Sequence, residues 1–154
     1  MGVLTVSIKE ELTLNGAQQG GVNTVSIASV TQSFKRVVTC PTGVDTTVAV
    51  FQAGTNTQDG ALGLEDVKYL RVTNLDASNS VNLSLQISAA ENGTADSSCT
   101  VLLQAGKSFI MGAVHDGIAV DDDAATIVTT LTDLESIIVD PSSNNVTVEV
   151  FIAS

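Results

Sequence analysis

The chain has 154 residues and a formal net charge of −11, and 44% of its residues are hydrophobic although only 3% are aromatic. This length predicts one domain with its own core, and the composition predicts that Val, Ile, Leu and Ala build it. The acidic balance argues against nucleic acid and anionic membranes as partners. No apolar run reaches the roughly 20 residues that cross a bilayer, and the opening MGVLTVSIKEEL lacks the pattern of a secretory signal, which favours a soluble chain.

Alternating apolar and polar residues predict that the chain begins with extended structure. Leu4, Val6 and Ile8 alternate with polar residues, the period of a strand with one buried face. The glycine-rich segment 15–21 predicts a loop, and three further strands are predicted over 22–30, 33–40 and 46–51. We therefore expect a single domain over 1–154 whose residues 1–20 form an extended N-terminal segment.

The second half contains the clearest strand pattern of the chain. Residues 80–88 read SVNLSLQIS, and with residues 67–75 and the turn DASN between them they predict a hairpin. A second hairpin is predicted from 100–104 and 108–111, which Ala105-Gly106-Lys107 separates. Residues 127–139 have partly helical spacing, but their threonines weaken a helix, so we expect one helical turn there at most.

The regular strand of residues 145–152 ends this series. About nine or ten strands with turns between them predict an all-β fold, a single-domain antiparallel β-sandwich of jelly-roll type. Its predicted core side chains include Leu83, Leu85, Ile87, Val146, Val148 and Val150.

His115 is the only histidine and lies in the segment Val114-His115-Asp116-Gly117. A Ser/His/Asp triad needs a nucleophile, and no GxSxG elbow occurs in the chain. A surface turn is therefore the favoured interpretation of this segment, and we expect a protein without enzymatic activity. No catalytic or cofactor-binding residue is predicted.

Asp121, Asp122 and Asp123 offer the oxygen ligands that calcium prefers. Consecutive residues of an extended segment point to alternating sides, however, and the spaced D-x-D-x-D-G loop is absent. A solvated acidic loop is favoured, so no metal site is predicted. Calcium binding with help from Asp116 or a neighbouring subunit remains the alternative, and it would fit a calcium-dependent carbohydrate-binding module.

Other residues of chemical interest have an ordinary explanation. Cys40 and Cys99 belong to no metal-binding pattern, which leaves two free thiols or, as the less favoured alternative, one disulfide. The glycosylation pattern N-x-S/T at Asn82, Asn92 and Asn145 is expected by chance in a chain rich in these residues. DGALG, with Gly60 and Gly63, lacks the lysine of a phosphate loop, and the single Tyr69 without any Trp weakens a lectin role.

Three segments resemble a known class of proteins: YLRVTNLDASNSVNLSLQI at 69–87, VLLQAGKSFIMG at 101–112 and LESIIVDPSSNNVTVEVFIAS at 134–154. Together they resemble the small virion structural proteins of tailed bacteriophages, particularly those of aquatic bacteria. The resemblance implies structural roles for Asn74 and Asp76 at a turn and for Gly106 at a tight bend. It transfers no functional residue.

The resemblance implies a virion protein that is assembled in the host cytoplasm. Its expected role is a head decoration or cement protein that works as a homo-oligomer, a trimer, and contacts the major capsid protein or other virion proteins. A neck, tail or fibre protein is the alternative within the same class. The acidic charge fits an outer surface away from DNA.

Overall fold

The computed structural model of the chain describes residues 1–53, 61–88, 95–121 and 127–154. These residues form β-strands and a single turn of 3-10 helix, Leu64–Asp66, which the sequence did not predict. The all-β prediction is therefore confirmed. The chain divides into two compact units, Met1–Gln32 and Ser33–Ser154. Within the described ranges, no helix is long and apolar enough to span a membrane.

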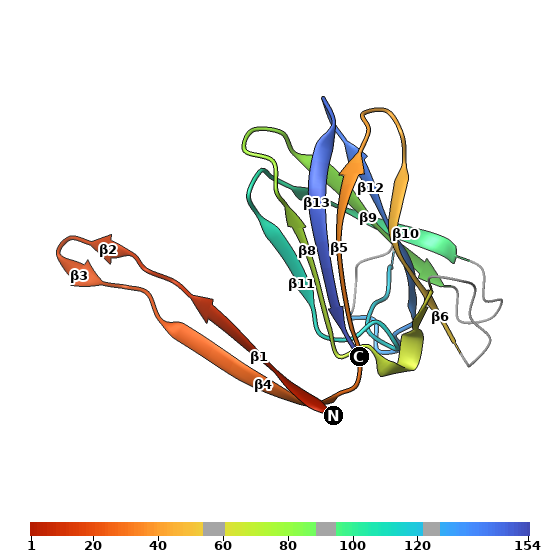
Figure 1. Cartoon of the computed structure of the whole chain (residues 1–154), viewed down its shortest axis with the longest axis horizontal. Coiled ribbons are helices and arrows are strands. Elements are labelled where there is room, and N and C mark those ends of the chain that lie inside the picture. Colours follow the sequence, from red (N-terminus) through yellow and green to blue (C-terminus); the bar gives the residue numbers. More distant parts are fainter. Residues whose placement is uncertain (54–60, 89–94, 122–126) are drawn as a thin grey trace. The chain divides into compact units, whose positions relative to one another are not determined.

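The first unit is a long β-hairpin, which we call the arm (Figure 1). β1 (Gly2–Lys9) pairs antiparallel with β4 (Val22–Val30), and β2 (Thr13–Leu14) pairs with β3 (Ala17–Gln18) at the tip. Asn15 and Gly16 connect the tip strands with φ of 51° and 78°, the positive values that two-residue hairpin turns require. We expected the N-terminal segment to end at residue 20, but the unit runs to Gln32 because β4 pairs with β1.

The second unit is β-sandwich-like and contains two mainly antiparallel sheets. One has the strand order β10-β9-β12-β6-β7 and the other the order β11-β8-β13-β5 (Figure 1). Among the described strands, only the short β7 pairs in parallel, with β6. The strands are β5 (Ser33–Cys40), β6 (Thr46–Gln52), β7 (Leu62–Gly63), β8 (Tyr69–Asn74), β9 (Val81–Ser88), β10 (Ala95–Leu103), β11 (Ser108–Met111), β12 (Leu134–Pro141) and β13 (Val146–Ala153).

The core of the second unit lies between these sheets and is almost entirely aliphatic. Alternate residues of β9 and of β13 are buried, as expected for strands with one face toward a core. The six core side chains predicted from the sequence are all buried, which confirms that prediction; they are Leu83, Leu85, Ile87, Val146, Val148 and Val150. Among the described side chains, none has a buried nitrogen or oxygen atom without a hydrogen-bond partner.

Both hairpins predicted for the second half are wrong. β8 lies in one sheet and β9 in the other, and the same holds for β10 and β11. The segments between them are turns, but each turn carries the chain from one sheet to the other. The two crossings meet, since the backbone N–H of Asn74 donates to Lys107 and that of Gly106 donates to Asn74. Gly106 has a φ of 70°, which suits the predicted tight bend.

Residues 127–139 contain no helical turn, which corrects the prediction for this segment. β12 begins at Leu134, and an isolated bridge joins Thr132 to Ile118. The apparent helical spacing came from Leu131, which is 42% exposed and takes no part in the core. From Leu134 onward the segment forms a strand instead of a helix, because pairing with the neighbouring strands buries Leu134, Ile137 and Val139.

Candidate interaction surfaces

The arm has one apolar face, which is formed where β1 pairs with β4. The register places Leu4 opposite Ile27 and Val6 opposite Val25, and Ile8 follows on the same side of β1. Directly opposite residues in an antiparallel pair point to the same side, so these five side chains form one continuous surface, the arm face. Ile8 is 49% exposed and Val25 is 53% exposed, and the first unit contains no second sheet layer to cover them.

The opposite face of the arm is mainly polar, although it includes the exposed Val22. Thr5 is paired with Ser26 and Ser7 with Thr24, and the hydroxyl oxygens of Ser7 and Thr24 lie 3.0 Å apart within hydrogen-bonding distance. Hydroxyl side chains of this kind are compatible with water. The arm is therefore amphipathic, with one face suited to solvent and one suited to burial against another surface.

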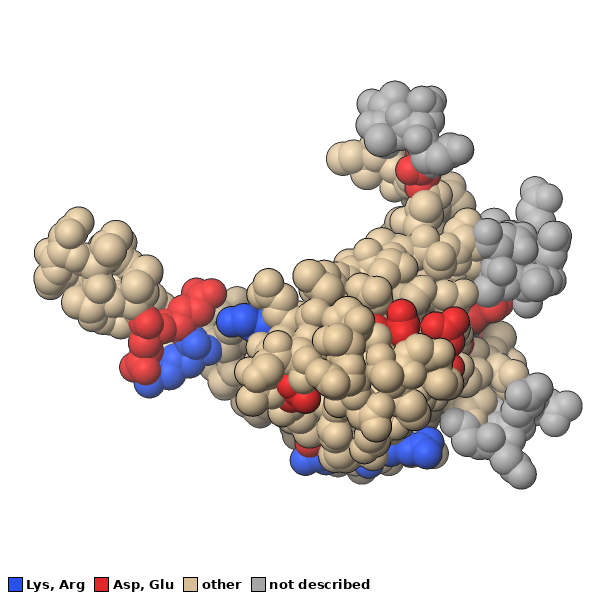
Figure 2. Space-filling view, turned by 90° about the horizontal axis from the view of Figure 1, so that it is seen from above, with Lys and Arg blue, Asp and Glu red and all other residues tan. Residues whose placement is uncertain are grey.

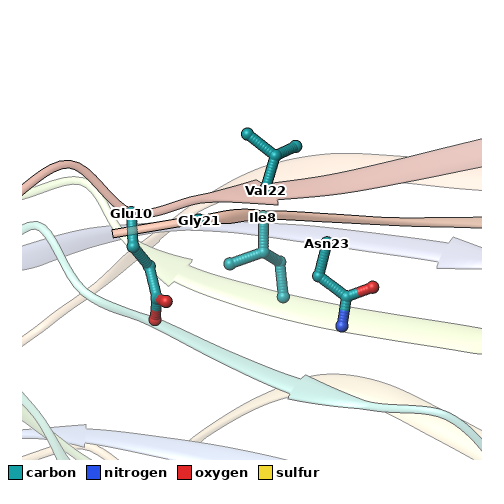
Figure 3. A pocket seen from close by; sticks show the side chains of 5 residues that line it. All are labelled: Ile8, Glu10, Gly21, Val22 and Asn23. Carbon is teal, nitrogen blue, oxygen red and sulfur yellow. The ribbon is translucent and has the colours of Figure 1, made fainter. Parts of the chain in front are cut away.

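The arm face ends in a small concave site of about 330 Å³ (Figure 3). Ile8, Glu10 and Asn23 extend to the same side of the hairpin there, whereas Val22 points to the other side (Figure 3). A backbone hydrogen bond of 2.8 Å from Glu10 to Gly21 closes this end. The apolar face is thus followed, on the same side, by one carboxylate.

The second unit has a mixed apolar and basic surface on the outer side of the β11-β8-β13-β5 sheet. The register places Phe151 of β13 opposite Lys35 and Arg71, and places Arg71 opposite Ile110. Val37, two residues after Lys35, points to the same side. We call this surface, with its side chains Lys35, Val37, Arg71, Ile110, Glu149 and Phe151, the sheet face. Val37 is 56% exposed and Ile110 is 43% exposed.

Glu149 links the two basic side chains of the sheet face. Its carboxylate lies 3.0 Å from the Lys35 ammonium and 2.5 Å from the Arg71 guanidinium. These two hydrogen bonds, of which the one from Lys35 has the larger effect, hold the pKa of Glu149 below its ordinary value. The side chain of Lys35 is 62% exposed, so its ammonium keeps donors that face solvent.

The charge of this sheet contrasts with that of the whole chain. Its four strands carry three basic residues, Lys35, Arg36 and Arg71, but Glu149 is their single acidic residue. The chain as a whole has 17 acidic and 6 basic residues. Figure 2 shows Lys and Arg gathered along the lower edge of the second unit, while most described Asp and Glu side chains of that unit lie elsewhere. Arg36 is paired with the core residue Val150 and so lies on the opposite side from Lys35. The outer side of this sheet therefore carries two basic residues and one acidic residue, a weakly basic surface on an acidic protein.

A polar groove of about 240 Å³ lies over the outer side of the other sheet. Two carboxylates border it, Asp45 and Asp140, and the amides and hydroxyls of β9 and β10 form its floor. The lining side chains are Asp45, Asn82, Ser84, Gln86, Thr100, Ile138 and Asp140. Such groups can bind a polyhydroxylated ligand or a cation, but they offer neither a nucleophile paired with a base nor an aromatic ring for stacking.

The ring of His115 contacts the carboxylate of Asp133. Its Nδ1 lies 2.9 Å from Asp133 Oδ1, which also accepts a 2.8 Å hydrogen bond from the backbone N–H of Asp116. His115, Asp116 and Asp133 each offer a metal-ligand atom within 4.8 Å of the others, the one such group among the described residues. The arrangement joins the turn at residues 113–117 to the start of β12, since Leu134 also donates to the Val114 carbonyl.

The remaining residues singled out in the sequence do not converge on one site. Asp121 is exposed, and Asp122 and Asp123 lie outside the described residues, as do Asn92 and Gly60. Cys40 and Cys99 are both free thiols, and Cys40 is buried. Burial raises the pKa of the Cys40 thiol. Tyr69 is buried, with its ring in an edge contact with Phe151 at 6.1 Å between centroids.

No protein-family model matches the chain, and neither a curated protein nor a solved structure matches it.

Sequence reasoning missed both interaction surfaces. The alternation of Leu4, Val6 and Ile8 predicts a strand with one buried face in an extended N-terminal segment, whereas these side chains form the exposed arm face. Two features of the sequence could have indicated the arm. Val25 and Ile27 continue the same apolar alternation, and Asn15 and Gly16, which lie between the two alternating segments, are typical of a hairpin turn. No sequence pattern indicates the sheet face, because its basic residues come from separate strands.

Proposed function

We propose that this protein is a structural component of a bacteriophage virion, a head decoration or cement protein that acts as a closed homo-oligomer. A trimer is the proposed state, with the major capsid protein or other virion proteins as further partners. It assembles in the host cytoplasm and resides in the virion. A neck, tail or fibre position is the alternative within this class, because fold does not assign a place in the particle.

The observation that carries the proposal is the exposed arm face. An isolated two-stranded hairpin is at best marginally stable in water, and an amphipathic hairpin gains stability when its apolar face is covered. Val25 and Ile8 are about half exposed although their alternation is that of buried positions. A surface of this kind is expected of a protein whose final structure includes other chains.

The strand order of the second unit supports a jelly roll, a fold used by many virion proteins. Its eight longer strands are divided as β5, β13, β8 and β11 against β6, β12, β9 and β10. Consecutive strands change sheet at every step except from β9 to β10, which pair directly. This pattern is compatible with two interleaved Greek keys.

A calcium-dependent carbohydrate-binding module is the second candidate, and the polar groove favours it. Asp45 and Asp140 with neighbouring amides and hydroxyls could bind sugar hydroxyls, either directly or through a cation. A glycan array with and without calcium, together with calorimetry, tests this candidate. Sugar binding that requires calcium and is lost in Asp140→Asn would favour it over the virion role.

Quantitative mass spectrometry of purified phage particles tests the main proposal. We expect the protein in particles at a copy number comparable to that of the major capsid protein. A copy number of a dozen or fewer would support the neck, tail or fibre alternative. Absence from particles would defeat the virion proposal.

A further inference from the structure

We infer that the arm of one copy packs its arm face onto the sheet face of a second copy. This inference rests on the proposed function, in that it names the partner surface through which a self-assembling protein would form its oligomer. It goes beyond that function because it assigns both surfaces to named residues. Neither surface is explained by the fold of its own unit.

The two surfaces match in their apolar parts. The arm face consists of aliphatic side chains along two paired strands. The sheet face offers three exposed or half-buried apolar side chains: Phe151, which lies between Lys35 and Arg71, Ile110 beyond Arg71, and Val37 beside Glu149 in the next row. Both surfaces have a strand pleat, so side chains of one can interdigitate with those of the other as in packed sheets. The four strands of the receiving sheet are about 19 Å wide, which is enough for the roughly 10 Å width of a two-stranded arm.

The two surfaces also match in charge. The arm face ends at Glu10, whose side chain extends to the same side as Ile8 (Figure 3). The sheet face carries Lys35 and Arg71 against the single carboxylate of Glu149. Because the chain has a net charge of −11, most of its surface repels another copy. On the sheet face two basic residues accompany one acidic residue, so such repulsion is reduced there, and the exposed Lys35 ammonium can meet a carboxylate of the arm.

The size of the contact indicates that the arms are exchanged. A two-stranded arm of eight residues covers about 26 Å by 10 Å, so one contact removes on the order of 500 Å² from solvent over both partners. A stable interface buries roughly 1,200 Å² or more. Reciprocal exchange between two copies doubles the buried area to about 1,000 Å², which approaches this value. In a closed ring each copy likewise uses both its arm face and its sheet face. Exchange therefore agrees with a closed oligomer.

Cross-linking between separately purified full-length chains tests the contact directly. One chain carries Ile8→Cys and the other Val37→Cys, both with Cys99→Ser, so that a cross-link between the new thiols must join two copies. We expect a cross-linked dimer from this mixture with a short bis-maleimide. Ser7→Cys, on the polar side of the same strand, is the matched control and should give at least tenfold less product.

Charge substitutions give a second readout, the oligomeric state by sedimentation velocity. Val6→Asp together with Val25→Asp should convert the oligomer to monomer, whereas Thr5→Asp with Ser26→Asp on the adjacent polar pair should not. Val37→Asp on the sheet face should have the same effect as the arm variant, and Val44→Asp, at a similarly exposed valine before β6, should have none. Circular dichroism checks that every variant is folded.

The outcomes separate this inference from the virion proposal. A wild-type protein that is monomeric at all concentrations, or an oligomer without the Ile8 to Val37 cross-link, would overturn the inference. A cross-link found only within one chain, in a variant that carries both cysteines, would also overturn it. The virion proposal fails instead when the protein is absent from particles, whatever the cross-link shows.

Discussion

The side-chain amide of Asn74 donates a 3.2 Å hydrogen bond to the backbone carbonyl of Leu103, 29 residues away and in the other sheet. The same amide donates to the Asn79 carbonyl at 2.8 Å, and its oxygen accepts from the backbone N–H of Asp76. Asn74 is fully buried. One polar side chain thus satisfies backbone groups at two of the crossings between sheets, the one after β8 and the one after β10.

Asn74→Ala should lower the free energy of unfolding by about 2 kcal/mol, because it leaves buried carbonyl groups without donors. Urea unfolding followed by circular dichroism measures this change. The matched control is Asn82→Ala, on the outer side of β9, for which we expect a change within about 0.5 kcal/mol. Equal effects of the two substitutions would contradict the role given to Asn74.

Leu85→Asp should prevent folding of the second unit. Leu85 is 3% exposed in the aliphatic core, and an aspartate there would be buried without a partner. Gln86→Asp, one residue further along β9 and on its outer face, should leave the protein folded. Far-ultraviolet circular dichroism and one-dimensional proton NMR distinguish a folded sandwich from a disordered chain. A folded Leu85→Asp protein would show that the core position is assigned wrongly.

The Asp76 carboxylate should stabilise the fold at neutral pH, and this stabilisation should be lost at acid pH. Its carboxylate accepts hydrogen bonds from the backbone N–H groups of Asn79 and Ser78, which hold the pKa of Asp76 below its ordinary value of 3.8. Since the pKa is lowered in the folded state, this stabilisation is present above the unfolded value and is lost as the pH falls through the folded value.

The comparison of wild type with Asp76→Asn isolates this contribution. The difference in urea midpoint between the two proteins should be largest at neutral pH and should shrink as the pH falls below about 4. Other carboxylates titrate in both proteins, so their contributions cancel in the difference. A difference that stays constant from pH 7 to pH 2.5 would show that the Asp76 carboxylate is not stabilised in the fold.

The strands could be predicted from the sequence, but their partners could not. Alternation at Leu83, Leu85 and Ile87 reports that one side of β9 is buried, and this was enough to find the strand and its core residues. It does not report which strand lies beside it. DASN was therefore read as a hairpin turn, although Asp76 and Asn79 form a local turn that carries the chain into the other sheet. Topology depends on contacts distant in sequence, which one sequence does not reveal.

The candidate surfaces were less predictable than the strands for a related reason. Lys35 and Arg71 are 36 positions apart and come together only because β13 lies between β5 and β8. The prediction that His115 lies in a surface turn needed only local sequence, since Asp116 and Gly117 follow it directly. The structure adds Asp133, which no local pattern connects with His115.

His115 should titrate above the ordinary histidine pKa of 6.5. The hydrogen bond with Asp133 is the main cause of the raised pKa, and the charges of Asp116, Asp133 and Glu65 add to it, against a smaller opposing effect of desolvation. Since the pKa is raised in the folded state, the protonated ring stabilises the fold below the unfolded value, and this contribution is lost as the pH rises through the folded value.

Proton NMR measures this pKa without ambiguity, because His115 is the only histidine and gives one set of ring signals. Asp133→Asn should lower the titration midpoint while its side-chain oxygen still accepts from Asp116, and Glu65→Gln should lower it less. His115→Ala should leave oligomer assembly unchanged, because His115 lies on neither the arm face nor the sheet face. A wild-type midpoint at or below 6.5 would refute the His115–Asp133 pairing in solution, and loss of assembly in His115→Ala would extend the oligomer contact to the turn at residues 113–117.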